Sequence, residues 1–80
     1  MDQKRIARLR LRFGWSQPRF SKALGVGNPL TISHWETGFR RPSGAAKRFL
    51  TFLERLSDSD LKKATSLLET IAEEESRKRS

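Results

Sequence analysis

The sequence predicts an all-α fold of five helices. Apolar residues recur at intervals of three and four along most of the chain, and no stretch shows the alternation of apolar and polar residues that marks a strand. The expected helices also begin at residues that can cap them, and the first three end at a glycine. Eighty residues is the length of a single domain.

The first expected helix covers Gln3–Phe13, and the second covers Gln17–Leu24. Apolar residues at helical spacing form one face of the first helix, and its arginines lie on the other sides. Ser16 can cap the second helix, because its hydroxyl can accept from a free backbone N–H one turn further on. Gly25 ends this helix, so we expect a short turn before the next one.

A third helix is expected over Pro29–Thr37. Asn28 is a good N-cap, and proline fits the first helical position because its missing N–H costs nothing there. Gly38 suits a left-handed helix end. Ile32 and Trp35 share one face at i, i+3 and are expected to point inward. The residues that then form or flank the outer face are Leu30, Thr31, Ser33, His34 and Thr37.

The last two expected helices begin at Ser43 and near Ser57, where each serine can act as a cap. The fifth helix carries apolar residues at a 3–4–3 spacing, which are Leu61, Ala64, Leu68 and Ile71. So narrow a seam is typical of one helix packing on another, and it predicts a dimer contact. The alternative is that this seam folds back within one chain, onto Phe49, Phe52 and Leu53. The segment Glu73–Ser80 is expected to be a frayed end.

Positive charge is concentrated in the first part of the chain. The whole sequence has a formal net charge of +8. Residues 1–55 hold twelve Lys and Arg against three acidic residues, whereas residues 56–80 hold five against six. This segregation favours a polyanionic partner over the alternative that the charge only serves solubility. Nucleic acid is the first candidate, and an anionic membrane surface is the second.

Other classes of site are not expected. The chain has no cysteine and one histidine, so disulfides and thiolate metal sites are excluded, and we expect neither a metal nor a cofactor. No apolar run approaches the ~20 residues of a membrane span, and no signal-peptide pattern precedes Ile6. We therefore expect a cytoplasmic, nucleoid-associated protein without a membrane partner. We also expect no enzymatic activity, because Glu36 has no second carboxylate or nucleophile at a useful spacing.

Two short helices joined around a glycine, the second with a polar outer face, are typical of a helix-turn-helix. "WSQPRFSKALGV" followed by "TISHWETGFRRPS" resembles the Cro and phage-repressor type of helix-turn-helix, the xenobiotic-response-element family. "WETGFRRPSGAAKRFL" is especially similar to the branch that contains small antitoxins and compact phage or plasmid regulators. The resemblance covers roughly Ile6 to Leu53. It implies a DNA-binding domain over residues 1–56, followed by a helix and tail for dimerisation over residues 57–80.

The resemblance also implies roles for individual residues. Asn28, Leu30, Thr31 and His34 match the positions that reach base edges, and Ser33 and Thr37 accompany them on the same helix. Arg10 and Glu36 match a partly buried ion pair between the first and third helices. The residues expected to contact DNA phosphates are Gln17, Arg19, Arg40, Arg41 and Lys47. The chain departs from the family in having one extra residue between Val26 and Ile32 and no Arg or Lys in the third helix.

These features together predict a sequence-specific regulator of transcription. We expect a dimeric repressor that reads an inverted-repeat operator in the major groove of double-stranded DNA with helix 29–37. One alternative is an antitoxin that binds a toxin protein and represses its own operon; an adjacent small open reading frame would favour it. A basic module for RNA or a membrane surface is the other alternative. It is disfavoured because helix 3–13 turns its apolar face to a core and no aromatic stacking surface is present.

Overall fold

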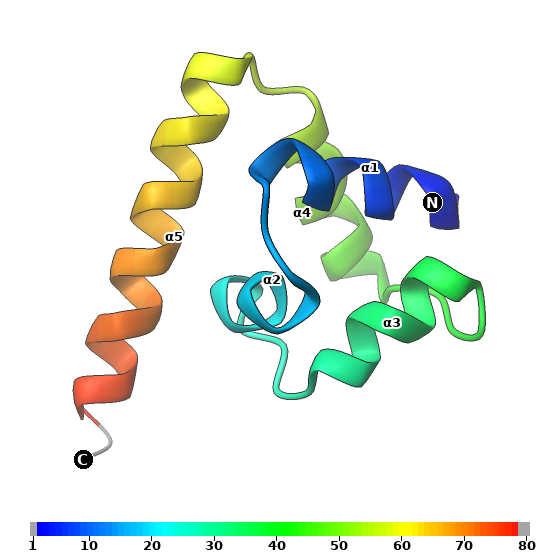
Figure 1. Cartoon of the computed structure of the whole chain (residues 1–80), viewed down its shortest axis with the longest axis horizontal. Helices are drawn as coiled ribbons and strands as arrows, with labels where there is room; N and C mark the ends of the chain where they lie inside the picture. Colours follow the sequence, from blue (N-terminus) through cyan, green and yellow to red (C-terminus); the bar gives the residue numbers. More distant parts are fainter. Residues whose placement is uncertain (1, 79–80) are drawn as a thin grey trace.

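The computed structural model describes residues 2–78, and every regular element in this part of the chain is a helix. The predicted all-α fold is therefore confirmed. The helices are α1 (Gln3–Phe13), α2 (Gln17–Leu24), α3 (Pro29–Thr37), α4 (Gly44–Glu54) and α5 (Asp58–Lys78). They follow one another through short connections, and α2 lies between α3 and α5 (Figure 1).

Local signals explain where the first four helices begin. The side chains of Asp2, Ser16, Asn28 and Ser43 each accept a hydrogen bond from a backbone N–H of the following first turn. Three of the helices end at a glycine with positive φ; at Gly25 and Gly38, for example, φ is 77° and 82°, a conformation that other residues rarely adopt. The expected bounds of α1, α2 and α3 are confirmed.

Helix α5 extends further than expected. The Ser57 hydroxyl accepts from the backbone N–H of Asp60 at 3.2 Å and caps the helix start. The helix then continues to Lys78. The prediction of a frayed end from Glu73 onward was therefore wrong for residues 73–78. Residues 79–80 lie outside the described part of the chain. Helix α5 contains no proline or glycine to stop it, and exposed charged side chains tolerate a helix well.

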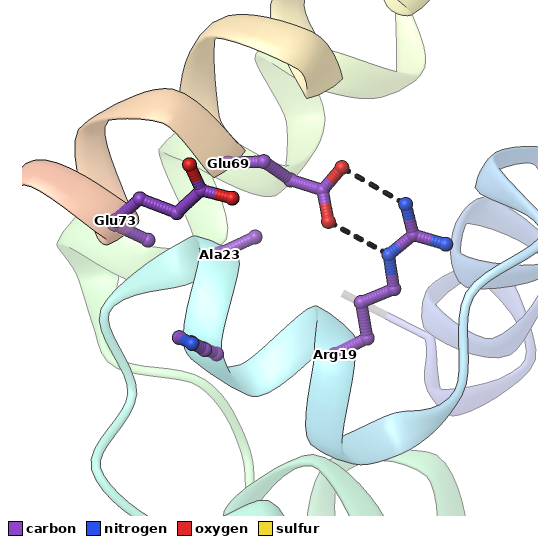
Figure 2. Close-up of a pocket in the computed structure, with 6 residues that line it drawn as sticks. Arg19, Ala23, Glu69 and Glu73 are labelled. Atoms are coloured by element: carbon purple, nitrogen blue, oxygen red, sulfur yellow. Dashed lines mark hydrogen bonds and ion pairs between the residues drawn. The ribbon is translucent and has the colours of Figure 1, made fainter. Parts of the chain in front are cut away.

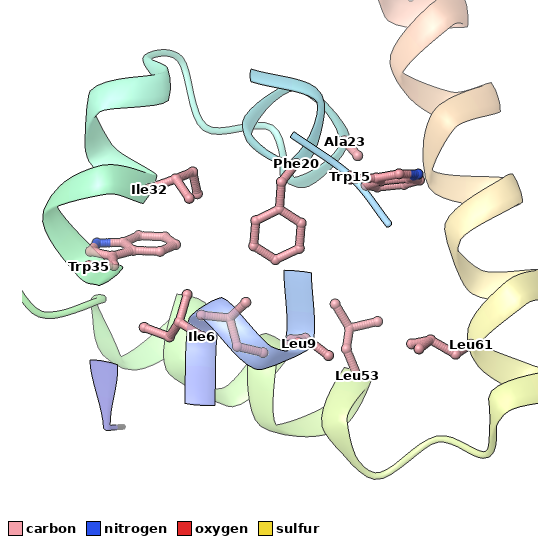
Figure 3. Packing of buried hydrophobic residues seen from close by; sticks show 10 residues of the cluster. Ile6, Leu9, Trp15, Phe20, Ala23, Ile32, Trp35, Leu53 and Leu61 are labelled. Carbon is pink, nitrogen blue, oxygen red and sulfur yellow. The ribbon is translucent and has the colours of Figure 1, made fainter. Parts of the chain in front are cut away.

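The core lies where α1, α2, α3 and α4 meet (Figure 3). Phe20 of α2 is completely buried and lies at the centre of the cluster. Its fully buried neighbours come from three other helices and are Ile6, Leu9, Ile32, Leu50 and Leu53. Trp15 and Trp35 are 6% and 7% exposed, so both tryptophans are core residues, as expected.

The predicted dimer seam on α5 is largely used inside the chain. Leu61 is 4% exposed within the core, and Ala64 and Leu68 pack against it. Of the four seam residues only Ile71, at 41%, keeps substantial exposure. Leu61 is therefore buried within its own chain and cannot join two chains, whereas Ala64 and Leu68 are only partly buried. The alternative, that this seam packs within one chain, agrees better with the structure. The surface it covers differs from the expected one on α4, because α5 packs chiefly against α2 and also against α1.

The packing of α5 also joins the segment expected to bind DNA to the segment expected to form the dimer. Leu61 of α5 belongs to one hydrophobic cluster with residues of the four preceding helices. Residues 57–78 therefore complete the core of residues 2–56. None of the described helices combines the length and the apolar character that crossing a membrane requires.

Candidate functional site

The turn between α2 and α3 is held by a buried serine. The Ser21 side chain is 2% exposed, and its hydroxyl donates to the carbonyl of Val26 at 2.8 Å. The backbone N–H of Val26 donates back to the Ser21 carbonyl at 2.9 Å. Both bonds cross the bend that Gly25 makes. The small side chain therefore lets the two helices approach and also fixes the chain between them.

A three-residue polar group sets the position of α3 against α1 and α2. Arg10 of α1 donates to both carboxylate oxygens of Glu36 on α3, at 2.7 and 3.0 Å, and to the Trp15 carbonyl at 2.8 Å. The Gln17 side-chain amide donates to Glu36 at 3.4 Å. The expected Arg10–Glu36 pair is thus present, and it is only 16% and 10% exposed. Its hydrogen bonds raise the pKa of Arg10, against the opposing effect of burial.

The outer face of α3 presents groups of varied chemistry. Leu30 is 59% exposed and Thr37 is also exposed, while the half-buried residues of this face are Thr31, Ser33 and His34. Asn28 is exposed too, but its Oδ1 accepts from the N–H of Leu30 at 3.0 Å as the helix cap. That leaves the side-chain NH₂ group as the part of Asn28 that can donate to a ligand without disrupting the cap.

Beyond α3 the chain folds back over the end of the helix. The backbone N–H of Arg40 and the hydroxyl of Thr37 both donate to the carbonyl of His34, at 3.2 and 3.3 Å. The ring of Phe39 lies against the His34 imidazole, with 4.8 Å between the centroids and 51° between the planes. This loop therefore places the ring of Phe39 against His34, and Arg40 and Arg41 follow it along the chain.

Two exposed basic side chains of α1 that could have bound phosphate are instead hydrogen-bonded within the chain. Arg5 of α1 donates to both carboxylate oxygens of Glu54 on α4. Arg12 donates to Asp58 at 2.8 Å and to two carbonyls at the end of α4 and in the α4–α5 connection. Both arginines tie α1 to the end of α4, and Arg12 also ties it to the first residue of α5, so their charges serve the fold.

Arg19, which was expected to contact phosphate, forms an ion pair within the chain. Its guanidinium donates to both oxygens of Glu69 on α5, at 2.7 and 2.9 Å (Figure 2). It also lies over the ring of Trp15, 4.7 Å from the ring centroid. The paired hydrogen bonds raise the pKa of Arg19 and lower that of Glu69. A carboxylate thus holds the oxygen-binding edge of this side chain, which joins α2 to α5.

Arg40 and Arg41 remain without such partners. Both are exposed, and neither forms an ion pair with any carboxylate of residues 2–78. They line a hollow that also includes Gly38 and the N-terminal residues Asp2 and Gln3. Lys47, on the second turn of α4, is exposed as well. The free cations expected to contact phosphate are therefore Arg40, Arg41 and Lys47.

Sequence reasoning missed the partners of Arg5, Arg12 and Arg19, because each lies more than 40 residues away along the chain. It also missed Phe39, for which the signal was present: a large aromatic residue stands in a polar loop next to the presumed reading helix.

Comparison of the chain with protein-family models, with curated proteins and with solved structures found no match. Within residues 2–78, no three side chains of the His, Cys, Asp and Glu types are grouped so that they could hold a metal ion.

Proposed function

We propose that this chain is a sequence-specific regulator that binds double-stranded DNA, most simply as a dimeric repressor. The observation that carries the proposal is the outer face of α3. It presents the exposed Leu30 and Thr37 and the half-buried His34, and it is followed along the chain by Arg40 and Arg41, two exposed arginines that form no ion pair with a described carboxylate. A short helix with varied hydrogen-bonding groups beside free cations suits a base-edge reader flanked by phosphate contacts.

The packing of α2 and α3 supports a helix-turn-helix of the Cro and phage-repressor type. The two helices contact each other across the bend at Gly25, and Glu36 fixes α3 through Arg10 and Gln17. In that motif the second helix enters the major groove while the first crosses the phosphate backbone. Rigid support is needed because a reading helix must keep its register to discriminate base pairs.

The side chains on α3 offer chemistry for several bases. His34 can donate to N7 or O6 of guanine, and more strongly when it is protonated. Thr31, Ser33 and Thr37 have hydroxyls that donate or accept, and Leu30 can pack on the thymine methyl group. The Asn28 NH₂ group can donate to an acceptor on a base. These contacts would supply sequence preference, because phosphate contacts alone cannot read sequence.

Phosphate contacts would come from Arg40, Arg41 and Lys47 rather than from Arg19. Each neutralised phosphate releases bound counterions, which makes binding favourable and salt-dependent. Arg40 and Arg41 stand directly after the reading helix and would hold it against the groove edge. Occupation of a promoter by the bound protein would then block transcription.

A second copy of the chain would pair along the side of α5 that the core leaves exposed. Leu67 is 60% exposed and Ile71 41% exposed, and Lys63 and Glu74 continue the same stripe at helical spacing. In an antiparallel pair centred between Leu67 and Ile71, Lys63 of one copy lies near Glu74 and Glu75 of the other. This complementarity supports a two-fold dimer, and such a dimer would read an inverted repeat.

The second candidate function is that of an antitoxin with DNA binding as autoregulation. The same exposed Leu67 and Ile71 favour it, because an apolar stripe on α5 can also bind a different protein. Sedimentation of the isolated protein separates the two: a dimer favours pairing of copies, and a monomer favours another partner.

Selection of duplexes from a random DNA pool, followed by footprinting of the enriched sequence, tests the proposal. We expect an inverted repeat with half-sites about one helical turn apart, protected from cleavage on one face. The variant His34→Ala serves as the control, because it should relax the preference at particular base pairs only. If the selection enriches no sequence, or if a parallel RNA pool is enriched instead, the proposed function is rejected.

A further inference from the structure

Phe39 has the highest exposed fraction, 71%, of the large apolar side chains in the described chain. Neither the hydrophobic core nor the proposed DNA contacts use it. Its ring nevertheless has a defined neighbour, because it lies against the His34 imidazole with 4.8 Å between centroids and a tilt of 51°. Tilted contacts of this kind are favourable for aromatic rings. An exposed aromatic residue thus rests on the one imidazole that faces outward from α3.

The backbone holds the two rings together. Gly38 turns the chain with φ of 82°, and the Gln3 side chain occupies the place where a Cβ on Gly38 would stand. Arg40 then donates its N–H to the carbonyl of His34 at 3.2 Å, and Thr37 donates its hydroxyl to the same oxygen. The carbonyl of His34 is therefore fixed from two sides. The backbone of Phe39, immediately before Arg40, is thereby held close to His34.

We propose that Phe39 is a specificity-determining positioning residue, whose ring holds the His34 imidazole in the orientation that reads a base edge. The inference rests on the proposed function. The torsion that orients an imidazole about its Cβ–Cγ bond has broad, nearly two-fold preferences. A histidine free to turn would present either ring edge to the groove. Contact with Phe39 selects one orientation before DNA binds, which reduces the ordering cost of binding.

Duplex selection with matched variants tests this inference. The preference of Phe39→Ala should fall by about three- to tenfold at the same base pairs that His34→Ala affects. This is a part of the roughly five- to 150-fold discrimination that a whole base contact carries, because the imidazole is retained but less well oriented. Its affinity for random duplexes should not change. Phe39→Tyr keeps the ring and should keep the preference. Phe52→Ala, which removes an exposed phenylalanine on α4, is the matched control and should have no effect.

The double variant separates positioning from direct contact. If Phe39 acts through His34, adding Phe39→Ala to His34→Ala causes no further loss of preference. In the free protein, proton NMR should show a shift of the imidazole resonances in Phe39→Ala but little shift in Phe39→Tyr, because the neighbouring ring displaces them. This second measurement does not depend on DNA.

Three results would overturn the inference and leave the proposed function standing. The first is an unchanged sequence preference in Phe39→Ala, and the second is that Phe39→Ala causes the same loss of preference in the His34→Ala background as in the wild type. The third is that the imidazole resonances do not shift when Phe39 is replaced by alanine. The second of these would assign Phe39 to the DNA contact itself. A wild-type protein that enriches no duplex rejects the proposed function, and the inference falls with it.

Discussion

Whether an arginine can bind DNA depends on what already occupies its donors. Carboxylates and phosphates both accept two parallel hydrogen bonds from a guanidinium, so the two compete for the same edge. Glu69 holds that edge of Arg19, and Glu36 and Glu54 hold Arg10 and Arg5 in the same way. Arg40 and Arg41, although exposed, have no such partner among the described residues.

We therefore expect Arg40→Ala and Arg41→Ala to weaken binding to the selected site and to random duplexes by similar factors. Each variant should also reduce the slope of log affinity against log salt by about one, because one phosphate contact is lost. Fluorescence titrations at several salt concentrations measure both effects. Lys62→Ala, on the distant first part of α5, is the control and should change neither. A loss confined to the selected site would show that these arginines read bases.

The Arg10–Glu36 pair should contribute to stability more than the exposed pairs do. Glu36→Ala leaves the half-buried Arg10 guanidinium without its carboxylate, and removing one partner of a buried pair is costly. We expect a loss of about 2–4 kcal/mol in the free energy of unfolding, measured by urea denaturation. Glu69→Ala is the comparison, and its loss should be smaller because the Arg19–Glu69 pair is solvated. Equal losses would contradict this ranking.

At the scale of the element, α5 carries two apolar stripes. One stripe packs against the core of the chain, and the other is exposed on the surface. The first three residues at the 3–4–3 spacing turn inward: Leu61 lies in the core of the same chain, and Ala64 and Leu68 pack against that core. Leu67, which precedes Leu68 in the sequence, stays exposed, and so does Ile71, the last residue of the 3–4–3 set. The Arg19–Glu69 pair fixes the middle of α5 on α2, on the other side of the buried stripe.

Acid should weaken the attachment of α5 to α2. The hydrogen bonds from Arg19 lower the pKa of Glu69 below its ordinary value of 4.5. A carboxyl group whose pKa is lower in the folded state stabilises the fold above its unfolded pKa, and this contribution is lost as pH falls through the folded pKa. We therefore expect faster hydrogen exchange of α5 amides as pH drops below about 4.5, after correction for the intrinsic rate.

Glu69→Gln should remove this pH-dependent part and exchange faster already at neutral pH. Glu73→Gln is the matched control, because Glu73 lines the same hollow as Glu69 but forms no ion pair with a described residue. If Glu69→Gln keeps the wild-type pH dependence, another group is responsible for it.

At the scale of the whole molecule, the small core and the exposed stripe on α5 both favour assembly. An 80-residue chain buries a modest share of its surface, so a second copy adds stability. A dimer would also place two copies of α3 about 34 Å apart, the distance between successive major grooves on one side of the duplex. Each copy would also bring its net charge of +8 to the same operator, which strengthens binding to the DNA phosphates.

Leu67→Lys should therefore yield a monomer by sedimentation, with helical content retained and operator affinity sharply reduced. The lysine would place a charge in the apolar centre of the proposed pair. Leu68→Lys differs by one position and should instead lower the stability of the fold, because Leu68 packs against the core. A Leu67→Lys protein that remains dimeric, or a wild type that is monomeric when bound to a single half-site, would contradict this dimer.

The sequence by itself determined the helices of this protein, because the signals that start and stop them are local. The caps Ser16, Asn28 and Ser43 act on amides within three residues, and Gly25 and Gly38 turn the chain where they stand. Apolar spacing also predicted the inward faces, including Trp35. The end of α5 was missed because helix propensity in an exposed, charged segment gives no sharp stop signal.

Only the tertiary structure decided which charges and which apolar residues remain available to a partner. Arg19 meets Glu69 across 50 positions of sequence, and Arg5 meets Glu54 across 49. No local pattern reports such encounters, because they depend on how α5 and α4 pack against the other helices. The same packing takes up Leu61 and Leu68 and leaves Leu67 and Ile71 exposed, since rotation of a helix about its axis is set by the surface it covers.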